Sequence, residues 1–362
     1  MEIGIPKETR PSEYRVGLSP AGVRMLATRG HTCYVEHDAG LSVGFTDTDY
    51  EQAGARLVFS HHEAFARADL VLKFARPLDD EIHLLRPGSA IAGFLHLPSA
   101  AQSKLDFFLK NEITAIAYEQ IQTDDGQRPV LRMLSEVGGR LAAQLAAQLL
   151  QNDRGGKGIL MGGMPGVPPA EVVVLGAGAA GCSATQAFLG MGAQLTVLDN
   201  DIQALQRVHE RCPHAVTMLA NTANIRRTAS FADVIVGAAA TAGQAAPVLI
   251  TREILKTMKP RSLVIDLSID QGGCFETSRP TSHDKPTFVE EGIIHYCVPN
   301  MTSVVARTAS HVFFNAAIPY ILEIAQKGLD TAIAENPALA RGINTHRGKV
   351  INLLRFEADK ED

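Results

Sequence analysis

Short apolar runs alternate with segments of helical periodicity along the first 130 residues. Glu2–Ile5 is the first apolar run, and the segment 19–29 that follows indicates a helix, with Ser19 as N-cap, Pro20 in the first turn and Gly30 as the stop. Further short runs that continue the strand pattern lie at 33–36, 50–53, 57–59, 68–74, 90–95 and 113–117. This alternation predicts an α/β domain with a mostly parallel sheet.

The longest helical pattern covers residues 135–152. Leu141, Leu145 and Leu149 recur every four residues there and form one apolar stripe. The next segment, 155–169, is dense in glycine and proline, which favours a loop or linker. It contains neither GKS nor GKT, so a P-loop is excluded.

A second α/β pattern runs from Glu171 to about Val298, and after about residue 306 the pattern is again helical. A helix is predicted at 309–327, with Pro319 inside it, and we expect this tail to pack on the first domain because an isolated amphipathic helix leaves its apolar face in water. We therefore predict two domains, 131–305 and 1–130 with 306–362. The strands predicted in the second domain are 172–175, 194–198, 234–237, 263–266 and 293–296.

Composition narrows the class of protein. Of 362 residues, 46% are hydrophobic, which excludes wholesale disorder, and a formal net charge of −5 argues against a nucleic-acid partner. The five cysteines are odd in number and none is at CxxC spacing, so neither disulfides nor a zinc site is expected and a reducing compartment fits. Glycine and glutamine interrupt the most apolar stretch, 172–198, which argues against a membrane span. We expect a soluble cytoplasmic protein.

The strongest motif follows the predicted strand at 172–175. Gly176, Gly178 and Gly181 form GxGxxG, a helix follows, and the next strand ends at Asp199. The first glycine permits a tight turn, the second lets backbone amides approach a pyrophosphate, and the third lets helix and strand pack closely. The helix N-terminus then presents unpaired N–H groups to the phosphates. A glycine-rich structural turn is the alternative, but strand, helix, second strand and acid are all in register for a dinucleotide.

Asp199 indicates which dinucleotide binds. A carboxylate at this position accepts hydrogen bonds from an adenosine ribose. Asn200 and Asp201 follow it, so a 2′-phosphate would meet carboxylates and no arginine. The cofactor predicted is therefore NAD and not NADP.

Five segments carry specific local motifs: MEIGIPKETRPSEYRVGLSPAGV, LHL around His96, SEVGGRLAAQ, GGMPGVPPAEVVVLGAG and DLSIDQGGCFETSRPTSHDKPTF. These segments resemble alanine dehydrogenase, and the resemblance extends from residue 1 to about residue 320. It implies two Rossmann-like, doubly wound domains with a substrate cleft between them. It also implies reversible conversion of L-alanine, NAD and water to pyruvate, ammonium and NADH, in a homo-oligomer (hexamer or dimer). The related NAD-binding subunit of transhydrogenase shares the fold, but SEVGGR and GGCFETSRPT favour the dehydrogenase.

The resemblance also implies which residues form the site. The family's carboxylate-binding arginine falls on Arg15, its catalytic histidine on His96 and its catalytic aspartate on Asp270. Asn300 is expected beside both substrate and cofactor. An arginine suits a carboxylate, and a histidine suits proton transfer near neutral pH. The full predicted cofactor set is Ser135, Gly176, Gly178, Ala179, Ala180, Gly181, Asp199, Val298, Asn300 and Met301, with no metal ligand.

The residues by themselves leave structural alternatives open. Arg15 can be a surface ion-pair partner of Glu13, His96 can be a core histidine between two leucines, and Asp270 can be a helix N-cap. His61 and His62 lie in a polar stretch and are interpreted as solvated.

One departure from the family lies in the substrate half. The family's KVKEP motif, whose second lysine meets the substrate's oxygens, is Lys73-Phe74-Ala75-Arg76-Pro77 here. A methyl group cannot donate to an oxyanion. In a regular strand Lys73 shares a face with Ala75 and is the candidate for a substrate-binding lysine, while Arg76 points to the opposite face. Whether Lys73 replaces the missing lysine is left open by the sequence. Three alternatives to an alanine dehydrogenase therefore stay open: a relative that acts on another 2-oxo or imino acid, an NAD-binding protein without catalysis, or a transhydrogenase-type subunit.

Overall fold

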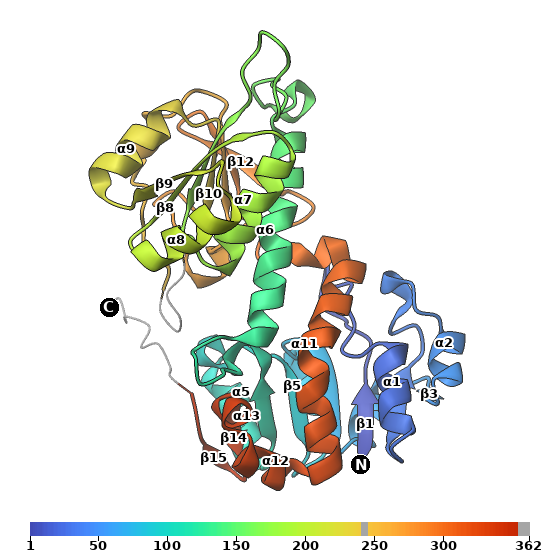
Figure 1. Cartoon of the computed structure of the whole chain (residues 1–362). Helices are drawn as coiled ribbons and strands as arrows, with labels where there is room; N and C mark the ends of the chain where they lie inside the picture. The colour runs from blue at the N-terminus through green and yellow to red at the C-terminus, as the bar shows by residue number, and fades with distance from the viewer. Residues whose placement is uncertain (240–244, 354–362) are drawn as a thin grey trace. The chain divides into compact units, whose positions relative to one another are not determined.

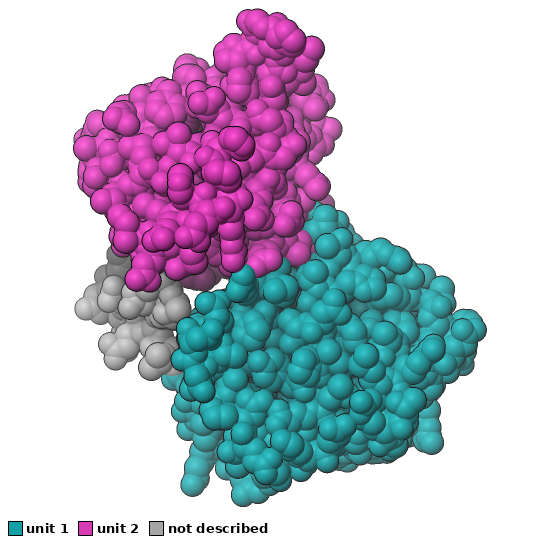
Figure 2. All heavy atoms as spheres, viewed as in Figure 1, with its two compact units in different colours: residues 1–134, 303–362 teal, residues 135–302 magenta. Residues whose placement is uncertain are grey.

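The computed structural model describes residues 1–239 and 245–353, and it divides the chain into two compact units (Figure 2). Unit 1 comprises Met1–Leu134 and Ser303–Asp362, and unit 2 comprises Ser135–Thr302. The chain thus leaves unit 1 after residue 134 and returns to it at residue 303.

Unit 1 is built on an eight-stranded sheet with the order β15-β14-β6-β5-β4-β1-β2-β3. β1 to β6 are parallel, while β14 and β15 are antiparallel additions at one edge (Figure 1). The elements are β1 (Glu2–Ile5), α1 (Pro20–Ala27), β2 (Thr32–Glu36), α2 (Asp47–Gln52), β3 (Arg56–Val58), α3 (His61–Ala66), β4 (Leu70–Ala75), α4 (Asp79–Ile82), β5 (Ala90–Phe94), α5 (Gln102–Lys110), β6 (Thr114–Ala117), α11 (Ala306–Lys327), α12 (Leu329–Glu335), α13 (Pro337–Arg341), β14 (Ile343–His346) and β15 (Lys349–Val350). Helix α6 (Pro129–Leu149) begins in unit 1 and continues into unit 2.

Two apolar clusters cover the two faces of this sheet. Alternate residues of β4 divide between them: Leu72 packs in the cluster that contains Phe313 of α11, and Val71 packs in the cluster that contains Phe65 of α3 and Phe108 of α5. This period of two is the strand geometry expected for a sheet buried on both faces. Helix α11, which follows unit 2 in the chain, is therefore part of the core of unit 1.

Unit 2 is built on a seven-stranded sheet with the order β12-β13-β11-β10-β7-β8-β9. Only β12 is antiparallel to its neighbour among these strands. The elements are β7 (Glu171–Leu175), α7 (Ala179–Gly190), β8 (Gln194–Asp199), α8 (Ile202–Arg211), β9 (Val216–Leu219), α9 (Thr222–Phe231), β10 (Val234–Gly237), α10 (Arg252–Leu255), β11 (Leu263–Asp266), β12 (Thr287–Glu290) and β13 (Ile293–Tyr296).

The predicted fold class, two doubly wound Rossmann-like α/β units, is confirmed, but the strand predicted at 50–53 is wrong. Residues 50–52 are the last residues of helix α2, and Ala53 is its C-cap. The helix begins after Thr46. The backbone N–H of Asp49 donates to Oγ1 of Thr46 at 3.2 Å, and the backbone N–H of Thr46 donates to Oδ2 of Asp49 at 2.7 Å. This capping box fixes the start of the helix, which the short pattern at 50–53 does not reveal.

Four strands that the pattern did not predict lie at or near sheet edges. β9, β12 and β15 are largely exposed or half-buried, so they lack an apolar run. β14 is buried but contains polar Asn344 and Thr345. Two helices also begin earlier than predicted, α6 at Pro129 and α11 at Ala306. No helix among the described residues is long and apolar enough to cross a membrane.

Candidate functional site

Both sheets have a point where the strand order reverses. In unit 1 it lies between β1 and β4, and in unit 2 between β7 and β10. Open parallel sheets of this kind bind ligands beyond the carboxyl ends of the strands at such switch points. Arg15 follows β1 and the glycine motif follows β7, while the other predicted residues lie in neighbouring strands, in the loops after them and, for Ser135, in a helix.

In unit 1, Arg15 lies in the loop after β1 and is buried. Its Nε donates to Oε1 of Glu13 at 2.6 Å, its Nη2 to Oε2 at 2.5 Å, and its Cζ lies 3.8 Å above the centre of the Phe74 ring. Arg15 does pair with Glu13, but the pair is internal and not at the surface. The bidentate pair and the aromatic face fix the plane of the guanidinium.

Lys73 is buried inside the same unit by two carboxylates. Its Nζ lies 3.0 Å from Oε2 of Glu8 and 2.9 Å from Oε1 of Glu81. Oε1 of Glu81 also lies 3.1 Å from Nε2 of His61, whose Nδ1 lies 2.7 Å from Oε2 of Glu36. This continuous network occupies Lys73, so the geometry does not support its replacing the missing lysine at position 75.

The backbone of β4 is irregular between these two positions. Leu72 pairs with Ala92, but Ala75 and not Phe74 pairs with Phe94, so the register shifts by one residue between them. A bulge of this kind disturbs the alternation of side chains. β4 is therefore not the regular strand that was assumed from the sequence. The backbone N–H groups of Phe74 and Ala75 both donate to Oε1 of Glu8, at 2.6 and 3.3 Å.

His96 follows β5 and has a left-handed backbone, with φ 46° and ψ 40°. Its side chain is 51% exposed, which excludes a core histidine. Its backbone N–H donates to Oε1 of Glu119 at 2.7 Å, and its Nδ1 lies 3.9 Å from the same oxygen. Oε2 of Glu119 is buried without a hydrogen-bond partner among the described residues. The sequence reasoning missed Glu119, although its place directly after the apolar run of β6 was a usable signal.

In unit 2, the glycine loop joins β7 to α7. Gly176 has φ 105°, and a Cβ there would lie 2.5 Å from the carbonyl oxygen of Ala238. A Cβ on Gly181 would lie 1.8 Å from the carbonyl oxygen of Gly176, so helix and strand require glycine to pack this closely. At Gly178, the N-cap of α7, a Cβ would meet nothing within 4 Å. The loop therefore presents an open backbone beside the first helical residues, Ala179 and Ala180, which fits a bound pyrophosphate.

Asp199 ends β8 beside this loop. Its Oδ2 accepts a hydrogen bond from the backbone N–H of Ala177 at 2.6 Å, and its Oδ1 accepts one from Asp201 at 2.8 Å. The carboxylate thus holds the glycine loop as well as standing where a ribose is expected. Asp201 caps α8 through the backbone N–H of Gln203.

Asp270 lies exposed in a short 3₁₀ helix (Ile269–Gln271) after β11. The N-cap of this helix is Ser268, so Asp270 is not an N-cap. Oδ2 of Asp270 lies 3.3 Å from the backbone nitrogen of Asn300, which has φ 54°. The structure thus brings together two residues that lie 30 positions apart.

The loop that carries Asp270 is held by buried Asp266 at the end of β11. Its carboxylate accepts hydrogen bonds from the backbone N–H groups of Ser268, at 3.0 Å, and Cys274, at 2.9 Å, and from Oγ of Ser278, at 2.5 Å. Burial raises the pKa of Asp266, and these hydrogen bonds oppose that rise. Asp266 is a second residue that sequence reasoning missed.

The remaining predicted cofactor residues are also in unit 2. Val298 and Met301 are buried close to Asn300 in the chain, and Ser135 lies in α6. The structure therefore places Arg15, Lys73 and His96 in unit 1, and all of the predicted cofactor residues, with Asp270, in unit 2.

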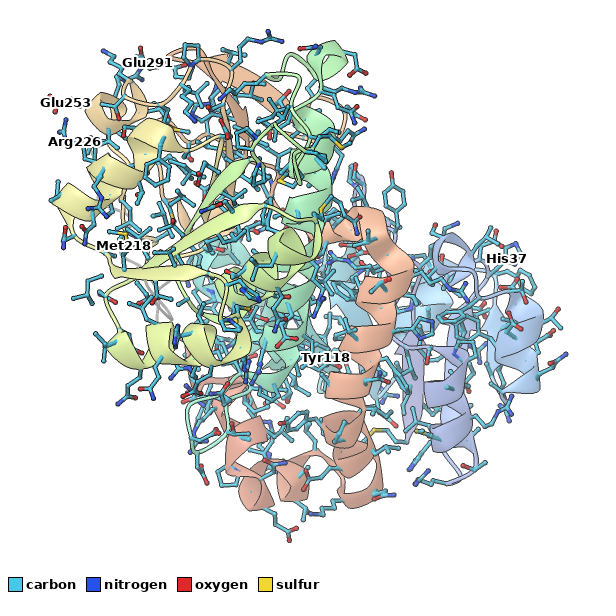
Figure 3. The ribbon with its side chains drawn as sticks, turned by 45° about the horizontal axis from the view of Figure 1, so that its top comes forward. His37, Tyr118, Met218, Arg226, Glu253 and Glu291 are labelled. Carbon is cyan, nitrogen blue, oxygen red and sulfur yellow. The ribbon has the colours of Figure 1, made fainter. Side chains whose placement is uncertain are left out.

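Other histidines have partners in the described part of the chain. His61 was expected to be solvated, but it is bound between two carboxylates and only His62 is exposed. His37, Asp38 and Asp47 form a group whose ligand atoms lie within 4.8 Å of one another (Figure 3). Each ring nitrogen of His37 already faces one of these carboxylates, so both nitrogens have partners within the group. All five cysteines are free thiols.

The fold and its loops define a class of protein: two doubly wound α/β units in one chain, the second of which carries the glycine fingerprint of dinucleotide-binding proteins. Comparison with known families makes this specific. Residues 4–138 match the N-terminal domain, and residues 142–353 the C-terminal domain, of the alanine dehydrogenase/PNT family. The chain belongs to this family.

Individual relatives agree over nearly the whole chain. It is 44% identical over 353 residues to alanine dehydrogenase of Mycobacterium tuberculosis (strain CDC 1551 / Oshkosh), which covers 97% of this chain and 95% of the relative. It is 43% identical over 351 residues to alanine dehydrogenase of Halomonas elongata, and this match covers 97% of this chain and 94% of the relative. A solved L-alanine dehydrogenase matches with a TM-score of 0.93 and 37% identity over 97% of both chains. A transhydrogenase structure from Sinorhizobium meliloti matches with a TM-score of 0.82 and 26% sequence identity, over 97% of this chain and 99% of that chain.

Proposed function

We propose that this chain is an NAD-dependent amino-acid dehydrogenase of the alanine dehydrogenase type. The reaction is L-alanine, NAD⁺ and water to pyruvate, ammonium, NADH and a proton, and it is reversible. The observation that carries the proposal is the complete glycine cradle with Asp199, in a chain that matches alanine dehydrogenases along nearly its full length.

Unit 1 would hold the substrate. The guanidinium of Arg15 would bind the substrate carboxylate, since Glu13 and Phe74 already fix its plane. His96 is half exposed beyond the carboxyl end of β5. It would transfer protons to and from the oxygen and nitrogen atoms bound to the reacting carbon. Glu119 would orient His96 through its backbone N–H. Lys73 would act indirectly, by holding Glu8 against the backbone of Phe74 and Ala75.

Unit 2 would hold the cofactor. The amides at the start of α7 would bind the pyrophosphate of NAD, and Asp199 would accept hydrogen bonds from the adenosine ribose. Ser135, Val298, Asn300 and Met301 would stand beside the nicotinamide, which supplies the hydride chemistry. Asp270 would stabilise the cationic imine with its carboxylate and exchange protons with it.

We also infer a cytoplasmic homo-oligomer without nucleic-acid or membrane partners. Five free thiols fit a reducing compartment. The resemblance to alanine dehydrogenases suggests a hexamer or a dimer, and light scattering at several protein concentrations would decide between them.

The test of the proposed function is NADH oxidation with ammonium and a panel of 2-oxo acids, followed by absorbance. We expect turnover of at least one 2-oxo acid, and turnover should fall to background in His96→Ala and Asp270→Ala while their NADH affinity stays within a few-fold. NADH binding by the wild type without turnover of any acid would contradict the proposal and favour an NAD-binding protein without catalysis.

A further inference from the structure

Two arginines stand beside Ala75 at the carboxyl edge of the unit 1 sheet. Arg10 lies in the loop after β1, and Arg76 directly follows β4. Nη2 of Arg10 is 3.5 Å from the backbone carbonyl oxygen of Arg76. Nε of Arg10 is buried and has no hydrogen-bond partner among the described residues. A buried donor without an acceptor is costly, so this atom indicates a group that the protein itself does not supply.

Neither arginine forms an ion pair with a carboxylate of the described chain. Burial, and next the charge of Arg76, lower the pKa of Arg10, which places the two guanidinium groups in electrostatic contact. Four acids interact electrostatically with Arg10, and each already has another cation: Glu8 and Glu81 hold Lys73, Glu13 holds Arg15, and Asp79 holds Lys104.

The pair also lies next to the proposed substrate anchor. The guanidinium of Arg15 stacks on Phe74, and Ala75 is the next residue, fixed through its backbone by Glu8. One cationic group for a carboxylate therefore lies on Phe74, and a second cationic pair flanks Ala75. Because Ala75 carries only a methyl group, it leaves room for a substrate side chain that a longer residue would fill.

We propose that Arg10 and Arg76 form a subsite for a second substrate carboxylate, so that the enzyme accepts acidic 2-oxo acids and the corresponding acidic amino acids. This inference rests on the proposed function, because it takes Arg15 as the anchor of the first carboxylate. A carboxylate at the subsite gains charge-assisted hydrogen bonds from guanidinium donors and gives Nε of Arg10 an acceptor.

The test is calorimetric titration of the NADH-saturated protein, without ammonium, with 2-oxoglutarate and with 2-oxopentanoate. The two acids have the same carbon chain, and only the first has a second carboxylate. We expect the wild type to bind 2-oxoglutarate at least about tenfold more tightly, since a hydrogen bond to a charged group contributes that much. Arg76→Gln and Arg10→Gln should remove the difference. Arg56→Gln, which changes an exposed arginine of β3, should keep it.

Equal affinities in the wild type, or an unchanged ratio in Arg76→Gln with NADH binding intact, would overturn the inference. Titration with inorganic phosphate separates a free-anion site: phosphate binding that needs Arg76, without a preference for 2-oxoglutarate, would also overturn it. Turnover is measured separately with ammonium. Failure to reduce any 2-oxo acid contradicts the proposed function, whereas the binding ratio alone decides the subsite.

Discussion

Individual side chains at the carboxyl edge of unit 1 differ in how their charge is neutralised. Arg15 has Glu13 as a bidentate partner, and Lys73 has two carboxylates, so both are held in place. Ala75, between Lys73 and Arg76 in the chain, contributes no charge. The chemistry at the carboxyl ends of these strands therefore depends on which side chains meet the substrate. Two predictions test this, one at Ala75 and one at Glu119.

Ala75→Lys should raise kcat/KM for pyruvate with ammonium by about tenfold or more. The new ammonium would stand where the family places a donor to the substrate oxygens, and one missing preorganised donor costs about 2.7–4 kcal/mol in systems where it has been measured. Recovery is expected to be partial, because residues in contact are not additive. Ala75→Met, which adds length without charge, is the control. A variant that folds and binds NADH yet gains no activity would exclude this explanation.

Glu119→Ala should lower kcat by about tenfold or more with little change in NADH affinity, because the backbone N–H of His96 loses its acceptor and the general acid–base group loses its orientation. Glu119→Gln keeps an acceptor oxygen and should restore most of the activity. If both variants lose activity equally, the charge of Glu119 and not its hydrogen bond is what matters.

At the scale of elements, the charged network ties together β2, α3, β4 and α4 through Glu36, His61, Lys73 and Glu81. The neighbouring cations lower the pKa of Glu81 to about 2 against the opposing effect of burial. Removing Lys73 would leave buried Glu8 without a cation and leave Glu81 with His61 alone. Lys73→Met is therefore expected to destabilise unit 1 by roughly 3–5 kcal/mol, the usual cost of breaking a buried pair.

The same network predicts a pH dependence of stability. Hydrogen bonds to Glu36 and Glu81 raise the pKa of His61 from 6.5 to about 9. A group with a higher pKa in the folded chain stabilises it fully below the unfolded value and loses this contribution as the pH rises through the folded value. We therefore expect His61 to contribute roughly 1–2 kcal/mol at pH 6.5, after allowance for its partial exposure, and to lose it by pH 9.

The measurement is the urea midpoint of unfolding at the two ends of this pH window, in wild type and His61→Gln. The midpoint of the wild type should fall relative to that of the variant as the pH rises. His62→Gln, at the exposed neighbour, is the matched control. A difference between wild type and His61→Gln that does not change with pH would show that His61 acts by packing alone.

The strand–loop–helix element of unit 2 gives a prediction on cofactor choice. The wild type should bind NADH more tightly than NADPH, because Asp199 repels a 2′-phosphate. Asp199→Asn should reduce the difference between the affinities for NADH and NADPH, while its side-chain oxygen still accepts a hydrogen bond from the backbone N–H of Ala177. Asp199→Ala should also lower the affinity for NADH, because this hydrogen bond is lost. Fluorescence titration with both cofactors measures this. Equal affinity of the wild type for both would remove the role proposed for Asp199.

At the scale of the whole molecule, the chain joins two units with the same winding, and the proposal gives them different ligands. Hydrogen exchange can separate these roles. NADH should protect amides of the glycine loop and α7 in unit 2, and a 2-oxo acid added afterwards should protect the loops after β1 and β4 in unit 1. Protection by NADH confined to unit 1 would contradict this assignment.

Features that local physics controls could be predicted from the sequence. Buried parallel strands are apolar along their length, so most strands of both sheets were predictable, and the glycines at 176 and 181 have conformational and packing requirements that few other residues meet. Edge strands such as β12 and β15 were not predictable, because one edge and much of their surface face water and impose no apolar pattern.

The roles of the polar residues of unit 1 depend on contacts that the sequence does not show. The bulge in β4 depends on pairing with β5, so no period in the sequence shows that the strand is irregular between Leu72 and Ala75. Burial of Arg15 with Glu13, and of Lys73 between Glu8 and Glu81, depends on segments far apart in the chain, since a charge has a partner only where the fold brings one to it. For the same reason the unpartnered Nε of Arg10 becomes significant only once every neighbouring carboxylate is seen to hold another cation.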